Sequence, residues 1–427
     1  MSCTGDSETN FQEIHIMTPG AHYQTDAARE RFSLAFIVAS VAMASVTYGI
    51  GRYAYGLFLP QIRRDFALDT FTLGLIASVG TVVYLLSNIV ASAIAIHFRP
   101  CTFTVIGGAV TTLGLALVGI ATSTPTAVGG ILLAGAGAGI YTPAQFEAIE
   151  AWLLPPWKSR AMGAVNAGAT PGKILTGLAA FWVQSSWQHA WLALAAVSFG
   201  VTVWNAWLLP KRAVAHAGTK AKQRLHFRLF TRAACIPLYG TLIVYGLLFS
   251  IYLTFAVDLL SSVGAMKSPV DKLFWPLLGI AGLTTVFTGS AVSRYGVRSL
   301  LSVSLPLCGL SYAMLVLASN TPWVILGSAV LFGAASIAPG TGFMVWGIRL
   351  FHERPSIGSG TVFFFQSIGT ITGPIVFGWI APRIGVVPVF LALAALSVVV
   401  LPFFPSRVFD TSAPGPSGAP EAGTEFV

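Results

Sequence analysis

Two basic residues lie inside long apolar runs of the sequence, where charge is unexpected: Arg52 in the run 33–60 and Lys173 in the run 160–182. If these runs cross a membrane, a charge at their centre costs about 2.5–3.5 kcal/mol on insertion scales, which makes both residues functional candidates. Arg52 lies about 18 residues into its run, or about 27 Å along a helix, and its guanidinium could bind a carboxylate bidentately. Lys173 lies about 20 Å deep, nearer the midplane. Both are predicted to contact a substrate, although Arg52 could instead extend outward or pair with Asp258.

Two acidic residues also lie in apolar runs. Glu147, near the end of the fourth run, is expected either to pair with a basic residue of the neighbouring loops and close a gate, or to carry a proton. Asp258, near the end of the seventh run, is expected to bridge to Arg52 or Lys272. Uncharged polar side chains inside the runs need partners away from water, either from a substrate or from a neighbouring helix. These further candidates for substrate binding are Tyr48, Tyr55, Asn166, Tyr245, Tyr252 and Gln366.

The composition indicates the class of protein to which these residues belong. Of 427 residues, 55% are hydrophobic and 9% are charged, and the mean hydropathy is +0.76. Soluble domains carry about 25% charged residues, so an ordinary soluble enzyme, a nucleic-acid binder and a disordered chain are excluded. The four cysteines form no C-x-x-C pair and have no metal-ligand spacing with histidine, so no metal or other cofactor is expected.

The apolar residues form runs long enough to cross a bilayer, which takes about 20 residues in a helix. The sequence predicts an all-α membrane protein with twelve spans, at 33–60, 71–96, 102–122, 127–149, 160–182, 190–209, 234–260, 273–292, 299–318, 323–348, 357–381 and 386–405. Residues 1–32 and 406–427 are predicted to be disordered tails, and 210–233 a central loop. The halves are therefore 33–209 and 234–405.

The basic residues orient these spans. With the N-terminus inside, 17 lysines and arginines fall on the inner side and 5 on the outer side, which predicts cytoplasmic termini. The central loop holds seven basic residues between Lys211 and Arg232 and no acid. It could bind anionic lipid or RNA, but a topology-setting loop explains it better, so no nucleic-acid partner is expected.

The two halves repeat one another weakly, at offsets of 196 to 201 residues. The matched pairs are Tyr48 with Tyr245, Tyr55 with Tyr252, Gly137 with Gly333, Pro143 with Pro339, and Gly172 with Gly373. Two six-helix, pseudo-symmetric halves are typical of secondary transporters, which bind substrate between the halves near the midplane.

Three stretches resemble the major facilitator superfamily over about residues 33–405. The segment Gly289–Arg298, GSAVSRYGVR, is similar to the loop signature G-x-x-x-D-R-x-G-x-R, with Ser293 in place of Asp. Gly137–Pro143 and the segments after it are similar to the fourth and fifth spans, and Tyr48–Pro60 is similar to the first span of a little-characterised bacterial group. The resemblance implies gating roles for Gly289, Arg294 and Arg298, while the N-terminal copy of this loop, 92–99, is degraded.

The resemblance and the charges together predict a monomeric secondary active transporter of the cell membrane that works by alternating access. Arg52 and Lys173 favour a small organic anion as substrate, taken up with protons as the coupling ion. Proton-antiport efflux of drugs or metabolites is one alternative, and a receptor or sensor that kept the fold without transport is another. Neither H-E-x-x-H nor G-x-S-x-G occurs, so no enzyme is expected.

Overall fold

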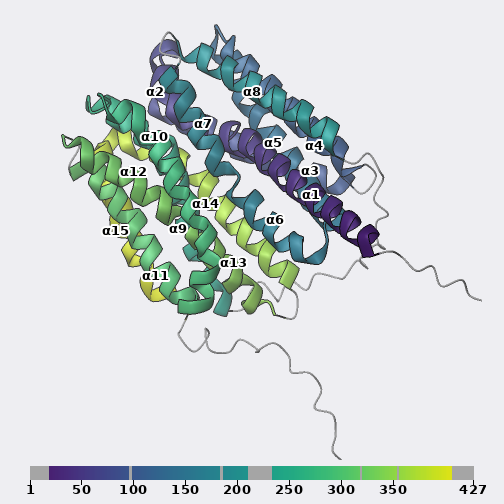
Figure 1. Cartoon of the computed structure of the whole chain (residues 1–427). Helices are drawn as coiled ribbons and strands as arrows, with labels where there is room; N and C mark the ends of the chain where they lie inside the picture. The colour runs from purple at the N-terminus through teal and green to yellow at the C-terminus, as the bar shows by residue number, and fades with distance from the viewer. Residues whose placement is uncertain are drawn as a thin grey trace, which may run out of the picture.

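The computed structural model describes residues 19–95, 99–182, 186–209, 233–317, 320–352 and 355–405, and within these ranges every regular element is a helix (Figure 1). The all-α fold is confirmed. Residues 1–18, 210–232 and 406–427, which make up most of the predicted tails and central loop, lie outside the described residues.

The first half of the chain contains eight α-helices and one short π-helix. They are α1 (Pro19–Ala44), η1 (Ser45–Ile50), α2 (Ala54–Phe66), α3 (Thr70–Ala95), α4 (Pro100–Gly119), α5 (Thr124–Trp152), α6 (Pro155–Ala167), α7 (Ala169–Trp182) and α8 (Trp187–Leu208). Helix α1 begins well before the predicted start of the first span, but its strongly apolar part starts at Phe32.

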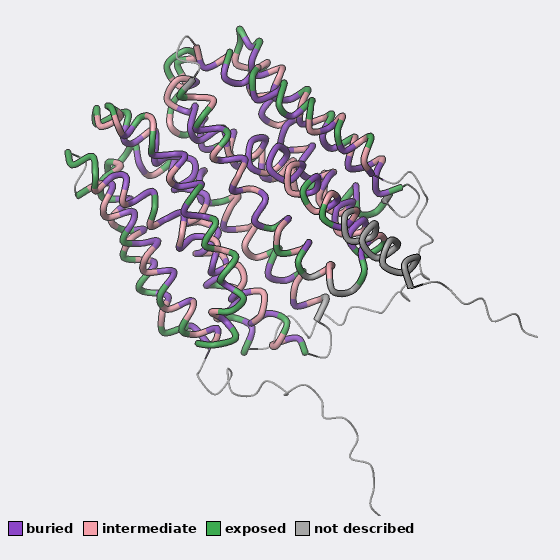
Figure 2. Tube along the Cα trace, viewed as in Figure 1, coloured by how far each residue is buried: buried purple, intermediate pink, exposed green. Residues whose placement is uncertain are grey.

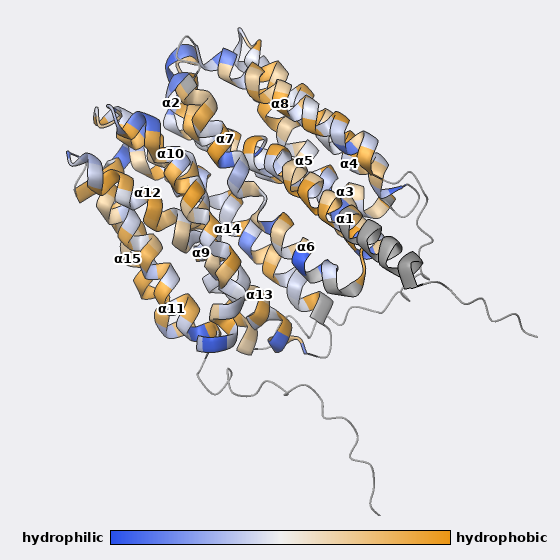
Figure 3. Cartoon of the chain, in the orientation of Figure 1, coloured by the Kyte–Doolittle hydropathy of each residue, from blue (hydrophilic) through white to orange (hydrophobic). Residues whose placement is uncertain are grey.

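The second half repeats the arrangement. Its elements are η3 (Ala233–Cys235), α9 (Ile236–Ser262), α10 (Val270–Ala281), η4 (Gly282–Phe287), α11 (Thr288–Leu317), α12 (Pro322–Ser336), α13 (Ala338–Leu350), α14 (Pro355–Ile384), α15 (Val386–Val399) and η5 (Leu401–Phe403). Exposed residues follow the outward faces of the bundle, and hydrophilic residues gather near the helix ends (Figures 2 and 3).

Ten helical segments of the described chain are long and apolar enough to span a membrane. One of them, 270–317, has 48 residues and contains α10, η4 and α11, and Gly296, with φ 82°, breaks the helical backbone within α11. The predicted fifth span is divided into α6 and α7, of 13 and 14 residues, so neither reaches spanning length alone. The count of twelve stays a prediction.

The predicted repeat has a counterpart in the packing of each half. In the first half, a Cβ on Gly49 would lie only 2.6 Å from the Cα of Gly172, so η1 and α7 touch backbone to backbone. In the second half, a Cβ on Gly246 would collide with the Gln366 carbonyl, so α9 and α14 cross in the same way. Matching glycines therefore allow the same helix crossing in both halves.

Among the described residues, the two halves contact each other mainly through α2 with α9, α3 with α14, and α7 with α10, and also through α6 with η4. Two of these contacts are made by glycine. A Cβ on Gly56 would collide with the Leu253 carbonyl, and a Cβ on Gly74 with the Pro374 carbonyl. Gly56 lies near the start of α2 and Gly74 in the first turns of α3, so the halves are closely packed a few turns inside the end of the bundle where α2 ends and α3 begins.

Candidate functional site

The first span is interrupted where Arg52 lies. The N–H of Gly51 donates to the Val46 carbonyl five residues earlier, at 2.9 Å, which is the hydrogen bond of a π-helix. Residues 51–53 form a turn, and α2 starts at Ala54. Such π-helical turns occur frequently at functional sites. The break places Arg52 and Tyr53 between two helical segments of one span.

Tyrosine rings surround the Arg52 guanidinium. Its Cζ lies 4.2 Å from the ring centroid of Tyr84, 5.7 Å from that of Tyr48 and 5.8 Å from that of Tyr53. The hydroxyls of Tyr48 and Tyr84 hydrogen-bond to each other, which fixes both rings. Cation–π contacts contribute about 0.5–2 kcal/mol each, more when water is excluded, so this tyrosine cluster of Tyr48, Tyr53 and Tyr84 holds Arg52 in its charged form.

Lys173 contacts the same cluster from α7. Its side chain is 3% exposed, and its Nζ lies 4.9 Å from the ring centroid of Tyr53 and 5.8 Å from that of Phe249 on α9. Tyr53 is therefore a shared neighbour of both cations. Because Gly49 lets η1 approach α7 closely, the two cations are brought to one ring from different spans.

A small cavity lies between the halves at this point. This central cavity of about 70 Å³ is lined by Arg52, Tyr53 and Tyr55, and by residues of α3, α5, α9 and α14. Phe249 forms part of its wall, and Lys173 lies behind Tyr53 and Phe249. Ligand pockets usually measure about 300–1,000 Å³, so this conformation holds the site in a contracted state.

The charges of Arg52 and Lys173 are not balanced by nearby carboxylates. Within the described ranges, ion pairs join Arg63 to Asp258 at 2.7 Å, Arg64 to Asp65 at 3.8 Å, and Lys158 to Glu150 at 2.6 Å. None of these pairs includes Arg52 or Lys173. The site thus presents positive charge among aromatic rings.

Asp258 has a different partner from the two that the sequence suggested. It binds Arg63, and not Arg52 or Lys272, because the end of α2 lies over the end of α9 and brings the guanidinium to the carboxylate. Arg52 is turned instead towards Tyr84. The pairing expected from the sequence was wrong, and the residue is used to join α9 to α2.

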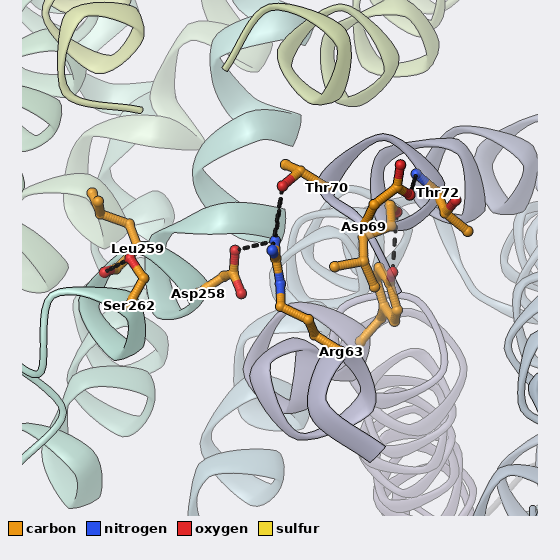
Figure 4. Close-up of polar contacts among 9 residues, drawn as sticks. Arg63, Asp69, Thr70, Thr72, Asp258, Leu259 and Ser262 are labelled. Carbon is orange, nitrogen blue, oxygen red and sulfur yellow. Dashed lines mark hydrogen bonds and ion pairs between the residues drawn. The ribbon is translucent and has the colours of Figure 1, made fainter. Parts of the chain in front are cut away.

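Figure 4 shows how the surroundings of this ion pair are built. Both terminal nitrogens of Arg63 donate to the Thr70 hydroxyl at 3.3 Å. Thr70 is the first residue of α3, and Asp69 just before it accepts from the Thr72 N–H at 2.8 Å. The hydrogen bonds from Thr72 lower the pKa of the Asp69 carboxyl, which keeps this cap ionised. Arg63 therefore connects α2, α3 and α9.

Three predicted tyrosines use their hydroxyls for packing between helices. Tyr55 donates to the Leu73 carbonyl at 3.0 Å, and Tyr245 donates to the Ser336 carbonyl at 2.8 Å. The Tyr252 and Ser328 hydroxyls lie 2.7 Å apart, and the Tyr252 ring stacks on Phe332. Tyr55 also lines the central cavity, whereas Tyr245 and Tyr252 do not.

The remaining candidates lie away from the tyrosine cluster. Asn166 is exposed on α6, Gln366 is half-buried on α14, and Glu147 is half-buried on α5. None of the three lines the central cavity, and their predicted roles stay predictions.

The loop signature falls where two helices meet. Gly296 supplies the positive φ of 82° that ends one helix and starts the next, which glycine adopts at little cost. Arg298 donates to the carbonyls of Phe404 and Pro405, at 3.2 and 2.9 Å, and so ties this turn to the end of the last helix. Gly289 and Arg294 are exposed.

The sequence reasoning missed three aromatic residues of the site: Tyr53, Tyr84 and Phe249. Tyr53 is adjacent to Arg52, and Phe249 lies 197 residues after it, which is the repeat offset of the first and seventh spans. Tyr53 and Phe249 could therefore have been found from the sequence, whereas no sequence pattern pointed to Tyr84. In the described part of the chain, no group of three or more His, Cys, Asp or Glu side chains could hold a metal ion.

Comparison with known proteins agrees with this architecture. The sequence profile described as "Major Facilitator Superfamily" matches residues 41–359, and the chain belongs to that family. It is therefore a membrane-embedded, multi-pass protein with the fold of a transporter. A search of curated proteins finds no match.

Solved structures of transporters share the fold. A mutant of the nucleoside transporter NupG aligns with a TM-score of 0.71 at 16% identity, over 87% of this chain and 98% of that one. A peptide-bound POT family transporter aligns at 0.68 and 14%, over 87% and 94%. A bacterial homologue of the human lysosomal transporter Spinster, inward-facing and unoccupied, aligns at 0.65 and 14%, also over 87% and 94%.

Proposed function

We propose that this protein is a monomeric secondary active transporter that takes up a small organic anion together with protons across the cell membrane. The observation that carries the proposal is the pair of cations at the tyrosine cluster, Arg52 and Lys173, neither of which forms an ion pair with a carboxylate among the described residues. An arriving carboxylate would supply the missing negative charge. Tyrosine rings would pack against the apolar part of the same solute.

The contraction of the central cavity supports a cycle of alternating access. At about 70 Å³ the cavity is too small for an organic solute, so binding requires the halves to separate on one side. The halves are closely packed through Gly56, which lies between Arg52 and the end of α2, and the positive-inside distribution predicts this end to face outward. We infer that this conformation is closed to the outside, with both termini in the cytoplasm.

The proposal is tested by uptake into liposomes that contain the purified protein. Panels of aromatic and aliphatic carboxylates and of hydrophobic amines are compared with and without an inward proton gradient. We expect carboxylates to accumulate, faster with the gradient. Arg52→Gln and Lys173→Met should each abolish or strongly reduce this uptake, whereas Lys267→Met, which removes an exposed cation outside the central cavity, should leave it unchanged.

Each other result contradicts the proposal in a distinct way. Movement of amines without movement of carboxylates would support proton-antiport efflux instead. Carboxylate binding without any flux would support a receptor or sensor. Unchanged uptake in both the Arg52 and Lys173 variants would place the substrate elsewhere.

A further inference from the structure

A second and much larger cavity lies at the end of the bundle where α2 ends. This outer cavity has a volume of about 740 Å³ and is enclosed by residues of α2, α7, α9 and α10 and of the connection between the last two. Its size falls within the usual range of pockets for small molecules. Gly56 and Leu253, which contact each other through their backbones, line the central cavity, and Leu57, next to Gly56, lines the outer cavity.

Positive charge exceeds negative charge in the wall of the outer cavity. The wall contains Arg63, Arg64 and Lys272 against Asp258 and Asp271. Asp258 is already bound to Arg63, and Arg64 pairs at 3.8 Å with Asp65, which lies outside the wall. Among the described residues, Lys272 is the wall cation outside these ion pairs, and it is the group that favours a negatively charged ligand.

Lys272 is paired with an aromatic ring in this wall. Its Nζ lies 5.4 Å from the ring centroid of Phe181 on α7, and both residues line the cavity. The two side chains together offer a cation for a carboxylate and an apolar face for the body of a solute. Two hydroxyl groups on the same wall can donate further hydrogen bonds, and they belong to Ser261 and Ser268, whereas the Ser262 hydroxyl donates to the Leu259 carbonyl.

Two buried polar atoms of the wall have no hydrogen-bond partner among the described residues. They are Nε of Arg63 and Oε1 of Gln61, both on α2. A buried donor without a partner costs about 1–3 kcal/mol, which a carboxylate would recover by accepting from Nε of Arg63, whereas Oε1 of Gln61 needs a donor. Both terminal nitrogens of Arg63 already donate to Thr70 and one of them also binds Asp258, so a carboxylate that accepts from Nε and one terminal nitrogen must compete with these contacts.

We propose that the outer cavity binds a small organic carboxylate, which competes with Asp258 for the guanidinium of Arg63. The apolar part of the ligand would lie against Phe181, with Lys272 as the second cation. Figure 4 shows the ion pair of Arg63 and Asp258 with which the ligand would compete. Because Arg63 and Asp258 join α2 to α9, this ligand weakens a contact between the halves. The binding site stands on its own geometry, whereas its role in admitting a transported solute rests on the proposed function.

The site is tested by chemical protection of the purified full-length protein in detergent. Lysines are acylated with a sulfonated succinimidyl ester, and the extent at each lysine is followed by mass spectrometry at increasing benzoate concentration. We expect benzoate to slow acylation of Lys272 at least fivefold. Lys267 is the matched control, since it is exposed on the same connection and does not line the cavity. Benzyl alcohol, which lacks the carboxylate, should protect neither lysine.

Competition with Asp258 is tested by removing its charge. In Asp258→Asn the benzoate concentration for half-protection should fall about tenfold, because Arg63 no longer has an internal carboxylate. Glu150→Gln removes the same charge from an ion pair with Lys158 outside the cavity wall and should leave this concentration unchanged. Arg63→Gln should abolish protection.

The proposal is overturned if benzoate protects Lys267 as strongly as Lys272, or protects neither. It is also overturned if Asp258→Asn weakens protection or leaves it unchanged. The wild-type measurement decides the first point even if a variant fails to fold. Protection without carboxylate uptake in liposomes would keep the outer site and reject the proposed function, and uptake without protection would do the reverse.

Discussion

The two halves share the same helix crossing, but they carry different side chains beside it. In the first half the span breaks at residues 51–53, and Arg52 and Lys173 meet at the tyrosine cluster. In the second half α9 runs unbroken from Ile236 to Ser262, and Phe249 stands at the repeat position of Arg52. Pro374 stands at the repeat position of Lys173.

This difference distinguishes the residues that serve helix packing from the residues proposed to bind substrate. The paired glycines are present in both halves because both crossings need close backbone approach. The cations are present in one half only, so the repeat does not require them. Phe249 faces Lys173 from the other half, so the second half contributes an apolar wall to a charged site. Substitutions at equivalent positions can therefore test each role separately.

The largest loss of stability is expected when a bulky side chain replaces a glycine at either helix crossing. Gly49→Leu and Gly246→Leu should each destabilise the protein by about 3 kcal/mol, the upper end of the range for overpacking, because backbone atoms occupy the space. Thermal unfolding in detergent measures this, with Gly163→Leu as the control, since nothing lies within 4 Å of a Cβ there. If only one of the two variants were destabilised, the two helix crossings would not be structurally equivalent.

Arg52→Gln should have the next largest effect, seen in transport. Loss of a charged hydrogen-bonding group costs about 1.5–3 kcal/mol, which corresponds to about a 10- to 100-fold fall in carboxylate uptake. Phe249→Leu, at the equivalent position, should reduce uptake only a few-fold. Initial rates in liposomes measure both. A larger loss from the Phe249 change would assign the chemistry to the second half.

Lys173→Met should separate function from stability. Replacing a buried ammonium by an apolar side chain of similar length should raise the free energy of unfolding by about 1–2 kcal/mol, within the range seen for buried charges. Uptake should fall in the same variant. Lys158→Met, which breaks a partly exposed ion pair with Glu150, should change stability by less than about 0.5 kcal/mol. A destabilised Lys173 variant would mean that the charge serves the fold.

The smallest effects are expected at the tyrosines of the first and seventh spans. Tyr55→Phe and Tyr252→Phe each remove one hydrogen bond and should cost about 1 kcal/mol of stability. Only Tyr55 lines the central cavity, so only its variant should shift the KM for uptake, by about twofold. A shift of KM in the Tyr252 variant instead would extend the site into the second half.

Much of this organisation could be predicted because it depends on local composition. Apolar runs predict helices directly, and a charge inside such a run marks Arg52 and Lys173 wherever the chain folds. The break at 51–53 was not predictable, since no single residue demands it: Gly51 fits there because a Cβ would meet the Thr111 side chain of α4 and the Ala134 carbonyl of α5. Those are tertiary contacts, which an apolar pattern does not encode.

The contact partners of the site residues were harder to predict than the site residues themselves. The ring nearest Arg52 belongs to Tyr84 on α3, whose spacing in the sequence is unremarkable in an apolar helix. Asp258 was recognised as a contact between halves, but its partner depends on how far α2 continues beyond the break. Helix α2 runs to Phe66, and this places Arg63, about three turns beyond Arg52, over the carboxylate.

The glycine contacts between the halves have a mechanical consequence. Side chains on packed helices form ridges that must leave one groove before entering another, which resists sliding. At Gly56 and Gly74 there is no ridge, since each meets a carbonyl of the opposite half directly. One helix can therefore roll over the other there while the contact is kept. These two points have the properties of a pivot, about which opposite ends of the bundle would move in opposite directions.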